Sequence, residues 1–184
     1  MRFTKGAIMK VVIVGGVAAG AGAATRLRRL DEQAEIVLLE RGEYISYANC
    51  GLPYHIGGEI PQRDSLLVMP EKTFADRFNV TVRSRHEALS VDRAAKTVSV
   101  RTPNGESIIL EYDKLLLATG SSPIIPPVPG TTDPRVRSPW TIPDVDALRG
   151  LGDTGARAAV AVGGCFTCPE TAQNLGARGP VMPL

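Results

Sequence analysis

Cysteine, histidine and aromatic residues are all scarce in this chain, and neither sign of charge dominates it. Its 184 residues hold three cysteines, two histidines and 5% aromatic residues, with 21 basic and 19 acidic side chains. Three unevenly spaced cysteines do not make a disulfide framework, which favours a reducing compartment, and we expect a cytoplasmic protein. The balanced charge provides no electrostatic surface for nucleic acid or for an anionic membrane.

The chain also lacks a long hydrophobic run. Its apolar stretches, such as 11–14 and 115–118, are far too short to cross a bilayer, and residues 1–10 contain no apolar signal-peptide core. The two histidines lie far from the cysteines at 165 and 168 without metal-ligand spacing, so we expect no metal site. With 43% hydrophobic residues, the chain can bury one core, or one domain and a fragment of a second.

A strand, a tight turn, a helix and a second strand are predicted near the N-terminus. Residues 10–14 form a β-branched run, residues 18–30 are alanine-rich with leucines at helical spacing, and residues 36–39 are continuously apolar. Backbone amides in the glycine-rich turn 15–20 can approach a pyrophosphate at a helix N-terminus, although Val17 stands at the middle glycine of the G-x-G-x-x-G pattern.

Glu40 strengthens this interpretation of the turn. It follows the second predicted strand, twenty residues after Gly20, where a carboxylate can accept both ribose hydroxyls of an adenosine. The alternative is a solvated loop charge that pairs at the surface with its neighbour Arg41. Together, the turn and Glu40 favour a dinucleotide-binding βαβ unit.

The fold class that we expect is α/β, a Rossmann-like parallel sheet with an inserted β-meander, incomplete at the C-terminus. The further elements that support it are a helix over 70–78, a third parallel strand over 80–82, a hairpin of 96–101 and 107–111, and a buried strand over 113–118.

Seven prolines between residues 121 and 143 mark a linker. After it, a helix over 144–151, a strand over 158–162 and a helix over 169–175 begin a second βα unit. The expected division is a domain over 1–130, a proline-rich linker over 131–150, and the start of a second domain over 151–184.

Cys50 is the most informative residue of the chain. Asn49 and Gly51 favour an irregular backbone around it, so we expect an exposed, reactive thiol; the alternative is a buried small hydrophobe, the commonest fate of an unpaired cysteine. His55 stands where a C-x4-C pair would have its second cysteine. The redox partner of Cys50 must therefore come from elsewhere, either a small thiol in a mixed disulfide or oxygen chemistry that leaves a sulfenic acid.

Three arginines on the first predicted helix, Arg26, Arg28 and Arg29, allow two interpretations. Arginines on a helix are usually solvated, but their planar geometry also suits the clamping of a substrate phosphate. The sequence leaves both interpretations open.

Cys165 and Cys168 form a C-x-x-C, which elsewhere is a redox pair or half of a zinc site. The two cysteines lack two further zinc ligands, and their surrounding sequence does not match a thioredoxin-like motif. Their context, a valine-rich run and two glycines before them, favours a second dinucleotide fingerprint whose middle and last glycines are replaced by cysteine. Side chains at these positions crowd the pyrophosphate and the contact between helix and strand.

Taken together, these motifs resemble one group of enzymes. Residues 15–29, the segment 40–54 around Cys50, residues 112–120 and the pair Asn174-Leu175 resemble the coenzyme A-disulfide reductases, a single-cysteine branch of the FAD-dependent pyridine nucleotide-disulfide oxidoreductases. The resemblance runs from about residue 9 to about residue 179. The same branch holds NADH oxidases, NADH peroxidases and sulfur reductases, which remain alternatives.

The resemblance implies a reaction and a set of binding residues. NAD(P)H reduces FAD, electrons pass to a mixed disulfide between Cys50 and coenzyme A (CoA), and free CoA leaves. Domain 1–130 then binds FAD, and 151–184 begins the NAD(P)-binding domain of a homodimer. The implied FAD-binding residues are Gly15, Gly16, Ala19, Gly20, Glu40, Arg41, Glu87, Ala88, Ala118, Thr119 and Gly120. The implied CoA-binding residues are Arg26, Arg29, Ser46 and Asn49.

Three features depart from the family pattern. Ser138-Pro139-Trp140 stands where the family reads close to Thr-Leu-Arg, and Cys165 and Cys168 degrade the expected NAD(P)H site. The rest of the NAD(P) domain, a second FAD-contacting segment and the dimerisation domain are not in these 184 residues. We therefore expect a truncated, poorly active copy of a reductase; a flavin-binding remnant without turnover is the alternative from another class.

Overall fold

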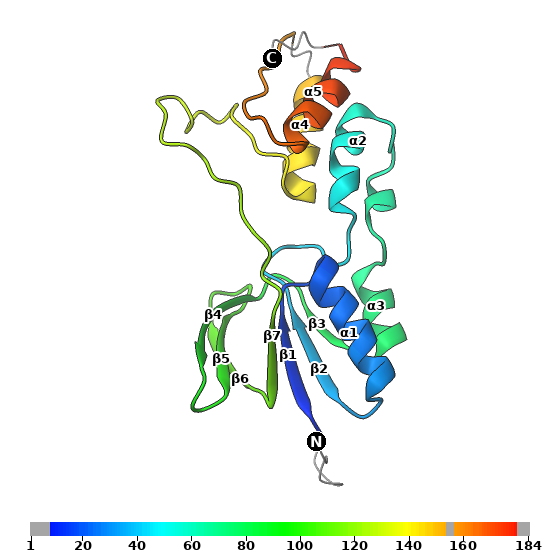
Figure 1. Cartoon of the computed structure of the whole chain (residues 1–184), viewed down its shortest axis with the longest axis vertical. Helices are drawn as coiled ribbons and strands as arrows, with labels where there is room; N and C mark the ends of the chain where they lie inside the picture. The colour runs from blue at the N-terminus through cyan, green and yellow to red at the C-terminus, as the bar shows by residue number, and fades with distance from the viewer. Residues whose placement is uncertain (1–7, 154–156, 180–184) are drawn as a thin grey trace. The chain divides into compact units, whose positions relative to one another are not determined.

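The computed structural model describes residues 8–153 and 157–179 (Figure 1). The chain divides into two compact units, one of residues 1–47 with 68–120 and the other of residues 48–67 with 121–184. The domain division at 1–130, 131–150 and 151–184 stays a prediction, because a compact packing unit is not by itself a ligand-binding domain. None of the helices in the described ranges has the length and apolar character that crossing a membrane requires.

The first unit is built on a four-stranded parallel sheet. Its strands are β1 (Lys10–Val14), β2 (Glu35–Leu39), β3 (Thr81–Arg83) and β7 (Lys114–Leu117), in the order β3-β2-β1-β7. β1 pairs in parallel with β2 and with β7, and the register sets Val12 beside Val37 and Leu115. The α/β fold with a Rossmann-like parallel sheet is confirmed.

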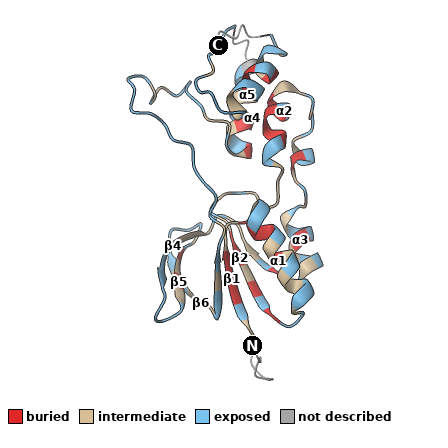
Figure 2. Cartoon of the chain, viewed as in Figure 1, coloured by how far each residue is buried: buried red, intermediate tan, exposed pale blue. Residues whose placement is uncertain are grey.

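Both faces of this sheet are covered. α1 (Ala18–Leu30) and α3 (Glu71–Phe78) lie on one face, and the antiparallel sheet of β4 (Glu87–Asp92), β5 (Thr97–Arg101) and β6 (Ser107–Glu111) lies on the other (Figure 1). Val11 and Ile13 of β1 pack with the helices, whereas Val12 between them packs with Val98 and Val100 of β5. Side chains alternate along a strand, so an apolar run such as β1 supplies both cores. Figure 2 shows that β1 is buried along most of its length.

Two strands of this unit differ from the expectation. The strand predicted as buried over 113–118 is β7, an edge of its sheet, and Leu117 is 61% exposed. β4 completes the β-meander but was not predicted as a separate element. Its Leu89 and Val91 are exposed, and its pairing slips between Ala88 and Ser90, so its sequence lacks a regular alternation of buried apolar residues.

The described part of the second unit is helical. It contains η1 (Asn49–Gly51), α2 (Leu52–Gly57), η2 (Arg63–Leu66), α4 (Ile142–Asp153) and α5 (Thr167–Gly176), and α2 packs against both α4 and α5. Its buried apolar side chains include Leu52, Ile56, Leu66, Ile142 and Val145. Residues 121–141 form neither helix nor strand, as their prolines predict.

The strand predicted over 158–162 is wrong. Only Ala158 makes an isolated bridge there, and Val160 and Val162 are 69% and 86% exposed. A buried parallel strand needs a neighbouring strand, and the described residues of this unit contain none that could pair with it. The helices predicted over 144–151 and 169–175 are present as α4 and α5.

Candidate functional site

The turn between β1 and α1 is packed so closely that glycine is required at both of its ends. Gly15 has a φ of +104°, and a β-carbon on it would lie 2.0 Å from the carbonyl oxygen of Ala118. A β-carbon on Gly20 would lie 1.7 Å from the carbonyl oxygen of Gly15. The structure therefore brings the predicted residues Gly15, Gly20 and Ala118 together.

The N-terminus of α1 is open to an anion. Val17, the residue before the helix, makes no side-chain capping bond, and the first turn holds no acidic residue. The first amides of a helix have no partner within the helix, and its dipole favours negative charge at this end. Ala19 lies in this first turn. The glycine-rich turn and the start of α1 together form a cradle that fits the pyrophosphate of a dinucleotide such as FAD.

Glu40 is fixed beside the same turn. Its carboxylate accepts two backbone hydrogen bonds of 2.7 Å, one from the N–H of Gly16 and one from the N–H of Gly42. A carboxylate offers about four lone-pair positions, so capacity remains for ribose hydroxyls. Glu40 is therefore a positioned acceptor and not only a solvated charge, whereas the side chain of its neighbour Arg41 is exposed.

The segment before β4 is tied to the backbone of Glu40. The N–H of Glu40 donates to the carbonyl of Arg83 at 3.0 Å, and the N–H of His86 donates to the carbonyl of Glu40 at 2.9 Å. These bonds bring the start of β4 beside Glu40. Glu87, the first residue of β4, forms a surface ion pair with Arg101 at 2.9 Å, and the next residue, Ala88, is partly buried and packs against the core cluster that includes Val98 and Val100.

The turn after β7 supplies the remaining predicted residues of the first unit. The N–H of Ala118 donates to the carbonyl of Val14 at 2.7 Å, which continues the β1–β7 ladder past the end of the strand. Gly120 has a φ of +65°, so the chain leaves the sheet in a left-handed conformation. Thr119 and Gly120 are both exposed at this edge.

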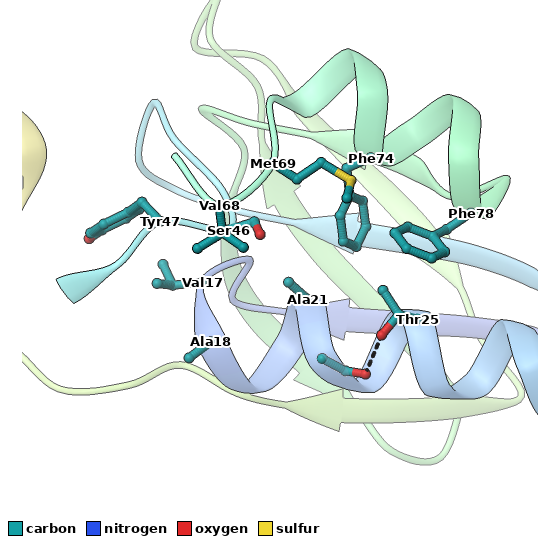
Figure 3. Close-up of a pocket in the computed structure, with 11 residues that line it drawn as sticks. Val17, Ala18, Ala21, Thr25, Ser46, Tyr47, Val68, Met69, Phe74 and Phe78 are labelled. Atoms are coloured by element: carbon teal, nitrogen blue, oxygen red, sulfur yellow. Dashed lines mark hydrogen bonds between the residues drawn. The ribbon is translucent and has the colours of Figure 1, made fainter. Parts of the chain in front are cut away.

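A pocket of about 310 Å³ lies along α1 (Figure 3). The small side chains of one face of α1, among them Ala18, Ala21 and Thr25, form one wall. The opposite residues are Ser46, Tyr47, Val68, Met69, Phe74 and Phe78. Sequence reasoning missed most of this pocket, although the alanine and glycine residues of α1 were a visible signal for a helix face that admits a ligand.

Ser46 links this pocket to the glycine-rich turn. Its N–H donates to the carbonyl of Gly16 at 2.9 Å, and its carbonyl accepts from the N–H of Val68 at 2.8 Å. Arg26 and Arg29 are exposed on α1. They stand four residues after Gly22 and Thr25, and residues at this spacing share a helix face, so they extend the pocket side of α1.

Arg28 has a structural role instead. Its guanidinium donates to the carbonyls of Phe78 at 2.9 Å and of Ala34 and Asn79 at 2.7 Å, and also to those of Asp31 and Glu32. These bonds join the ends of α1 and α3. Of the three arginines considered for binding a phosphate, Arg28 is therefore the one whose guanidinium is used in hydrogen bonds to the backbone.

In the second unit, Cys50 is exposed within η1, directly before α2, and its neighbour Asn49 is also exposed. The alternative of a buried, inert cysteine is therefore wrong. Gly51 is buried, and a β-carbon on it would lie 3.0 Å from a methyl of Leu66, which leaves little room for a side chain. The turn that carries Cys50 is thus packed closely against Leu66 at Gly51, whereas Cys50 itself is exposed.

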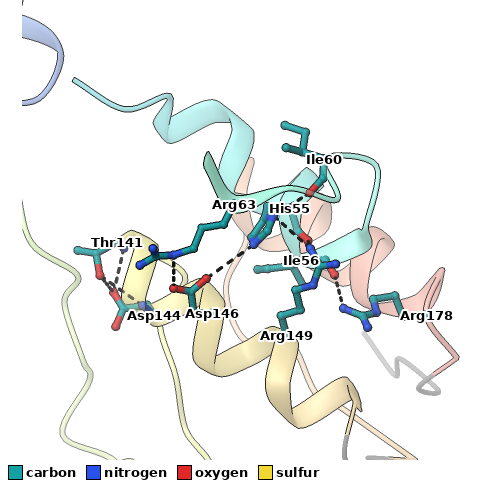
Figure 4. A network of polar contacts seen from close by, with 9 residues as sticks. All are labelled: His55, Ile56, Ile60, Arg63, Thr141, Asp144, Asp146, Arg149 and Arg178. Carbon is teal, nitrogen blue, oxygen red and sulfur yellow. Dashed lines mark hydrogen bonds and ion pairs between the residues drawn. The ribbon is translucent and has the colours of Figure 1, made fainter. Parts of the chain in front are cut away.

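His55 is buried and fully engaged in the packing of α2. Its Nδ1 lies 2.7 Å from the carbonyl of Ile60, and its Nε2 lies 3.7 Å from the carboxylate of Asp146 (Figure 4). Arg149 donates to the carbonyl of His55 at 3.1 Å, and Arg63 forms an ion pair with Asp146 at 2.7 Å. His55, which stands where a C-x4-C pair would have its second cysteine, is therefore part of a structural network.

The second cysteine pair lies at the start of α5. Cys165 is exposed, and Cys168, the second residue of α5, is partly buried. Gly163 has a φ of +134°. Among the described residues, no group of three or more histidine, cysteine, aspartate or glutamate side chains is placed to hold a metal ion.

The chain matches a family model described as "Pyridine nucleotide-disulphide oxidoreductase" over residues 9–180. It is 33% identical to the coenzyme A disulfide reductase of Staphylococcus haemolyticus over 172 residues, which cover 92% of this chain and 38% of that protein. Reduced CoADR-RHD from Bacillus anthracis matches with a TM-score of 0.93 and 40% identity, over 97% of this chain and 33% of that chain. An NAD-dependent persulfide reductase from A. fulgidus matches with a TM-score of 0.91 and 34% identity, over 95% and 33% respectively.

Proposed function

Because the chain belongs to the pyridine nucleotide-disulphide oxidoreductase family, we propose that it provides the FAD-binding region and the reactive thiol of an NAD(P)H-dependent CoA-disulfide reductase. The observation that carries this proposal is the exposed Cys50 in the turn before α2, with the buried His55 where a partner cysteine would stand. The chain spans little more than a third of the length of such curated relatives, so the activity is proposed for the protein in which all parts of the enzyme are present.

The first unit supports FAD binding. The open N-terminus of α1 receives the pyrophosphate, the carboxylate of Glu40 receives the ribose hydroxyls, and the segment at Glu87 and Ala88 borders the adenine. The turn after β7, formed by Ala118, Thr119 and Gly120, would border the cofactor beside the glycine-rich turn. When bound, FAD supplies the transfer of two electrons between a nicotinamide nucleotide and a disulfide.

Cys50 acts on the substrate by thiol–disulfide exchange. Its thiolate attacks one sulfur of CoA disulfide, an S–S bond forms between Cys50 and one CoA, and the other CoA leaves as a thiolate. No cysteine lies five residues away to displace the bound CoA by an internal disulfide. We therefore take the mixed disulfide as the oxidised form of this chain; two electrons, with protons, would cleave it to the Cys50 thiol and a second free CoA.

The pocket along α1 supports CoA as the substrate. Its apolar lining suits the pantetheine arm, and Ser46 provides a hydroxyl at its edge. Arg26 and Arg29 extend the same side of α1 in a position to bind phosphates of the nucleotide end. The family resemblance also assigns Asn49, the neighbour of Cys50 in sequence, to CoA binding.

The segment around Gly163 does not fit a pyrophosphate as the turn at Gly15 does. Cys165 and Cys168 stand at the middle and last glycine positions, and no strand forms over 158–162 to support the turn. We expect this chain alone to bind NAD(P)H negligibly.

A persulfide reductase is the second candidate, because a solved structure of such an enzyme is 34% identical to this chain. In either case the reacting group of this chain is the exposed Cys50, so the acceptor distinguishes the two candidates. Reduced protein is treated separately with CoA disulfide and with polysulfide, and the Cys50 peptide is identified by mass spectrometry. A CoA adduct that forms at Cys50 supports the reductase proposal. An unmodified Cys50 peptide with CoA disulfide, together with added sulfur from polysulfide, supports the second candidate.

A further inference from the structure

Cys165 and Cys168 have no part in the proposed function, yet the fold holds them close together. The N–H of Cys168 donates to the carbonyl of Cys165 at 3.0 Å, which closes a turn at the start of α5. A hydrogen-bonded turn of this kind keeps the Cα atoms of its first and fourth residues within about 7 Å. A disulfide spans Cα separations of roughly 4.4 to 6.8 Å, so the turn sets the two cysteines at bridging distance.

The two cysteines differ in access but lie at the same end of α5. Cys165 is exposed and precedes the helix, whereas Cys168 is partly buried within its first turn. The Sγ of Cys168 lies 3.8 Å from the point that a β-carbon on Gly163 would occupy, so this sulfur is directed back over the loop that carries Cys165.

We propose that Cys165 and Cys168 form a second thiol–disulfide exchange site, independent of Cys50, whose substrate is a low-molecular-weight disulfide. The thiolate of Cys165 attacks one sulfur of the disulfide and releases one small thiol. The thiolate of Cys168 then attacks Cys165 in the mixed disulfide and releases the second. Two cysteine thiols are oxidised to one disulfide, and one small disulfide is reduced to two thiols.

The surroundings favour this role over half of a zinc site. A structural zinc ion takes four ligands, and in the described parts of the chain no third cysteine, histidine or carboxylate completes a cluster with this pair. Cysteine thiols at a turn before a helix can close a disulfide without a further group. The inference goes beyond the proposed function because it needs neither FAD nor Cys50.

The test uses the full chain with Cys50→Ser, so that any exchange comes from the pair. Reduced protein is mixed with glutathione disulfide, quenched in acid, alkylated and mapped by mass spectrometry, while released glutathione is measured. We expect two equivalents of glutathione per chain and a peptide in which Cys165 and Cys168 are joined, two hydrogens lighter than the dithiol.

The matched variant is Cys50→Ser with Cys168→Ser. It should release one equivalent and retain glutathione on Cys165, because the second attack is lost. Glutathione that persists on either cysteine of the intact pair, or release limited to one equivalent, would overturn the proposal. The intact-pair measurement decides the matter even if the double variant folds poorly, and it does not depend on whether Cys50 reacts with CoA disulfide.

Discussion

Gly20 lies so close to Gly15 that a β-carbon on Gly20 would stand 1.7 Å from the carbonyl oxygen of Gly15. The start of α1 thus contacts the end of β1 directly, and this contact shapes the cradle proposed for FAD. Gly22, two residues later on the same helix, has nothing within 4 Å of the point that a β-carbon on it would occupy. Substitutions at these two glycines therefore distinguish the effect of close packing at Gly20 from the general cost of glycine in a helix, which applies to both.

We predict that Gly20→Ala destabilises the chain and Gly22→Ala does not. Overpacking costs roughly 1–3 kcal/mol or more, since backbone must move to admit the methyl group. Alanine at the exposed Gly22 should raise the free energy of unfolding by up to about 1 kcal/mol through helix propensity. Urea unfolding of both variants measures this, and equal stabilities would contradict the packing described for the turn.

The Glu40 carboxylate predicts an effect on FAD binding. Glu40→Gln keeps the shape of the side chain but sets an amide NH2 against the N–H of Gly16 or Gly42, so one hydrogen bond is lost and ribose recognition is disturbed. FAD affinity, measured by quenching of flavin fluorescence, should fall about tenfold or more.

The control for Glu40 is Glu43→Gln. Glu43 is exposed and paired with Arg85 at the surface, where an ion pair contributes little. If the two variants bind FAD equally well, Glu40 does not contact the cofactor.

Local sequence patterns predicted most of the elements around this site. The predictions failed where the structure depends on contacts between segments that are distant in the sequence. Helix 18–30 was found because its alanines and leucines carry helical spacing. The apolar run at Val160 and Val162 has the same local character as β1, but a strand also needs partners, and no local pattern supplies them. The pocket was missed because Thr25 and Phe74 meet across it from two separate helices.

The exposure of the cysteines predicts an order of alkylation. Cys50 and Cys165 are exposed and Cys168 is partly buried, and alkylation requires that the reagent reach the thiolate. In the folded protein, iodoacetamide should modify Cys50 well before Cys168, as followed by peptide mapping over time. Labelling of Cys50 only after addition of denaturant would remove the basis for its catalytic role.

From the positions of Arg26 and Arg29 we predict that the chain prefers a disulfide substrate that carries phosphates over one that carries none. The double variant Arg26→Gln with Arg29→Gln should slow the reaction of Cys50 with CoA disulfide about tenfold, because charge-assisted hydrogen bonds to phosphate are lost. Its reaction with glutathione disulfide should not change. Arg93→Gln removes another exposed arginine of the first unit and serves as the control. A loss with both substrates, or the same loss in the control, would contradict the assignment.

The most direct test of the central claim is the rate at which unmodified protein forms a mixed disulfide at Cys50 with CoA disulfide, compared with glutathione disulfide at equal concentration. Both rates come from mass spectrometry of the Cys50 peptide in one time course. If Cys50 is the thiol that attacks the substrate of a CoA-disulfide reductase, the CoA adduct should form at least about ten times faster than the glutathione adduct. Recognition of the nucleotide then adds to the exchange chemistry. Equal rates would show that Cys50 is exposed but not adapted to CoA, and would contradict the account.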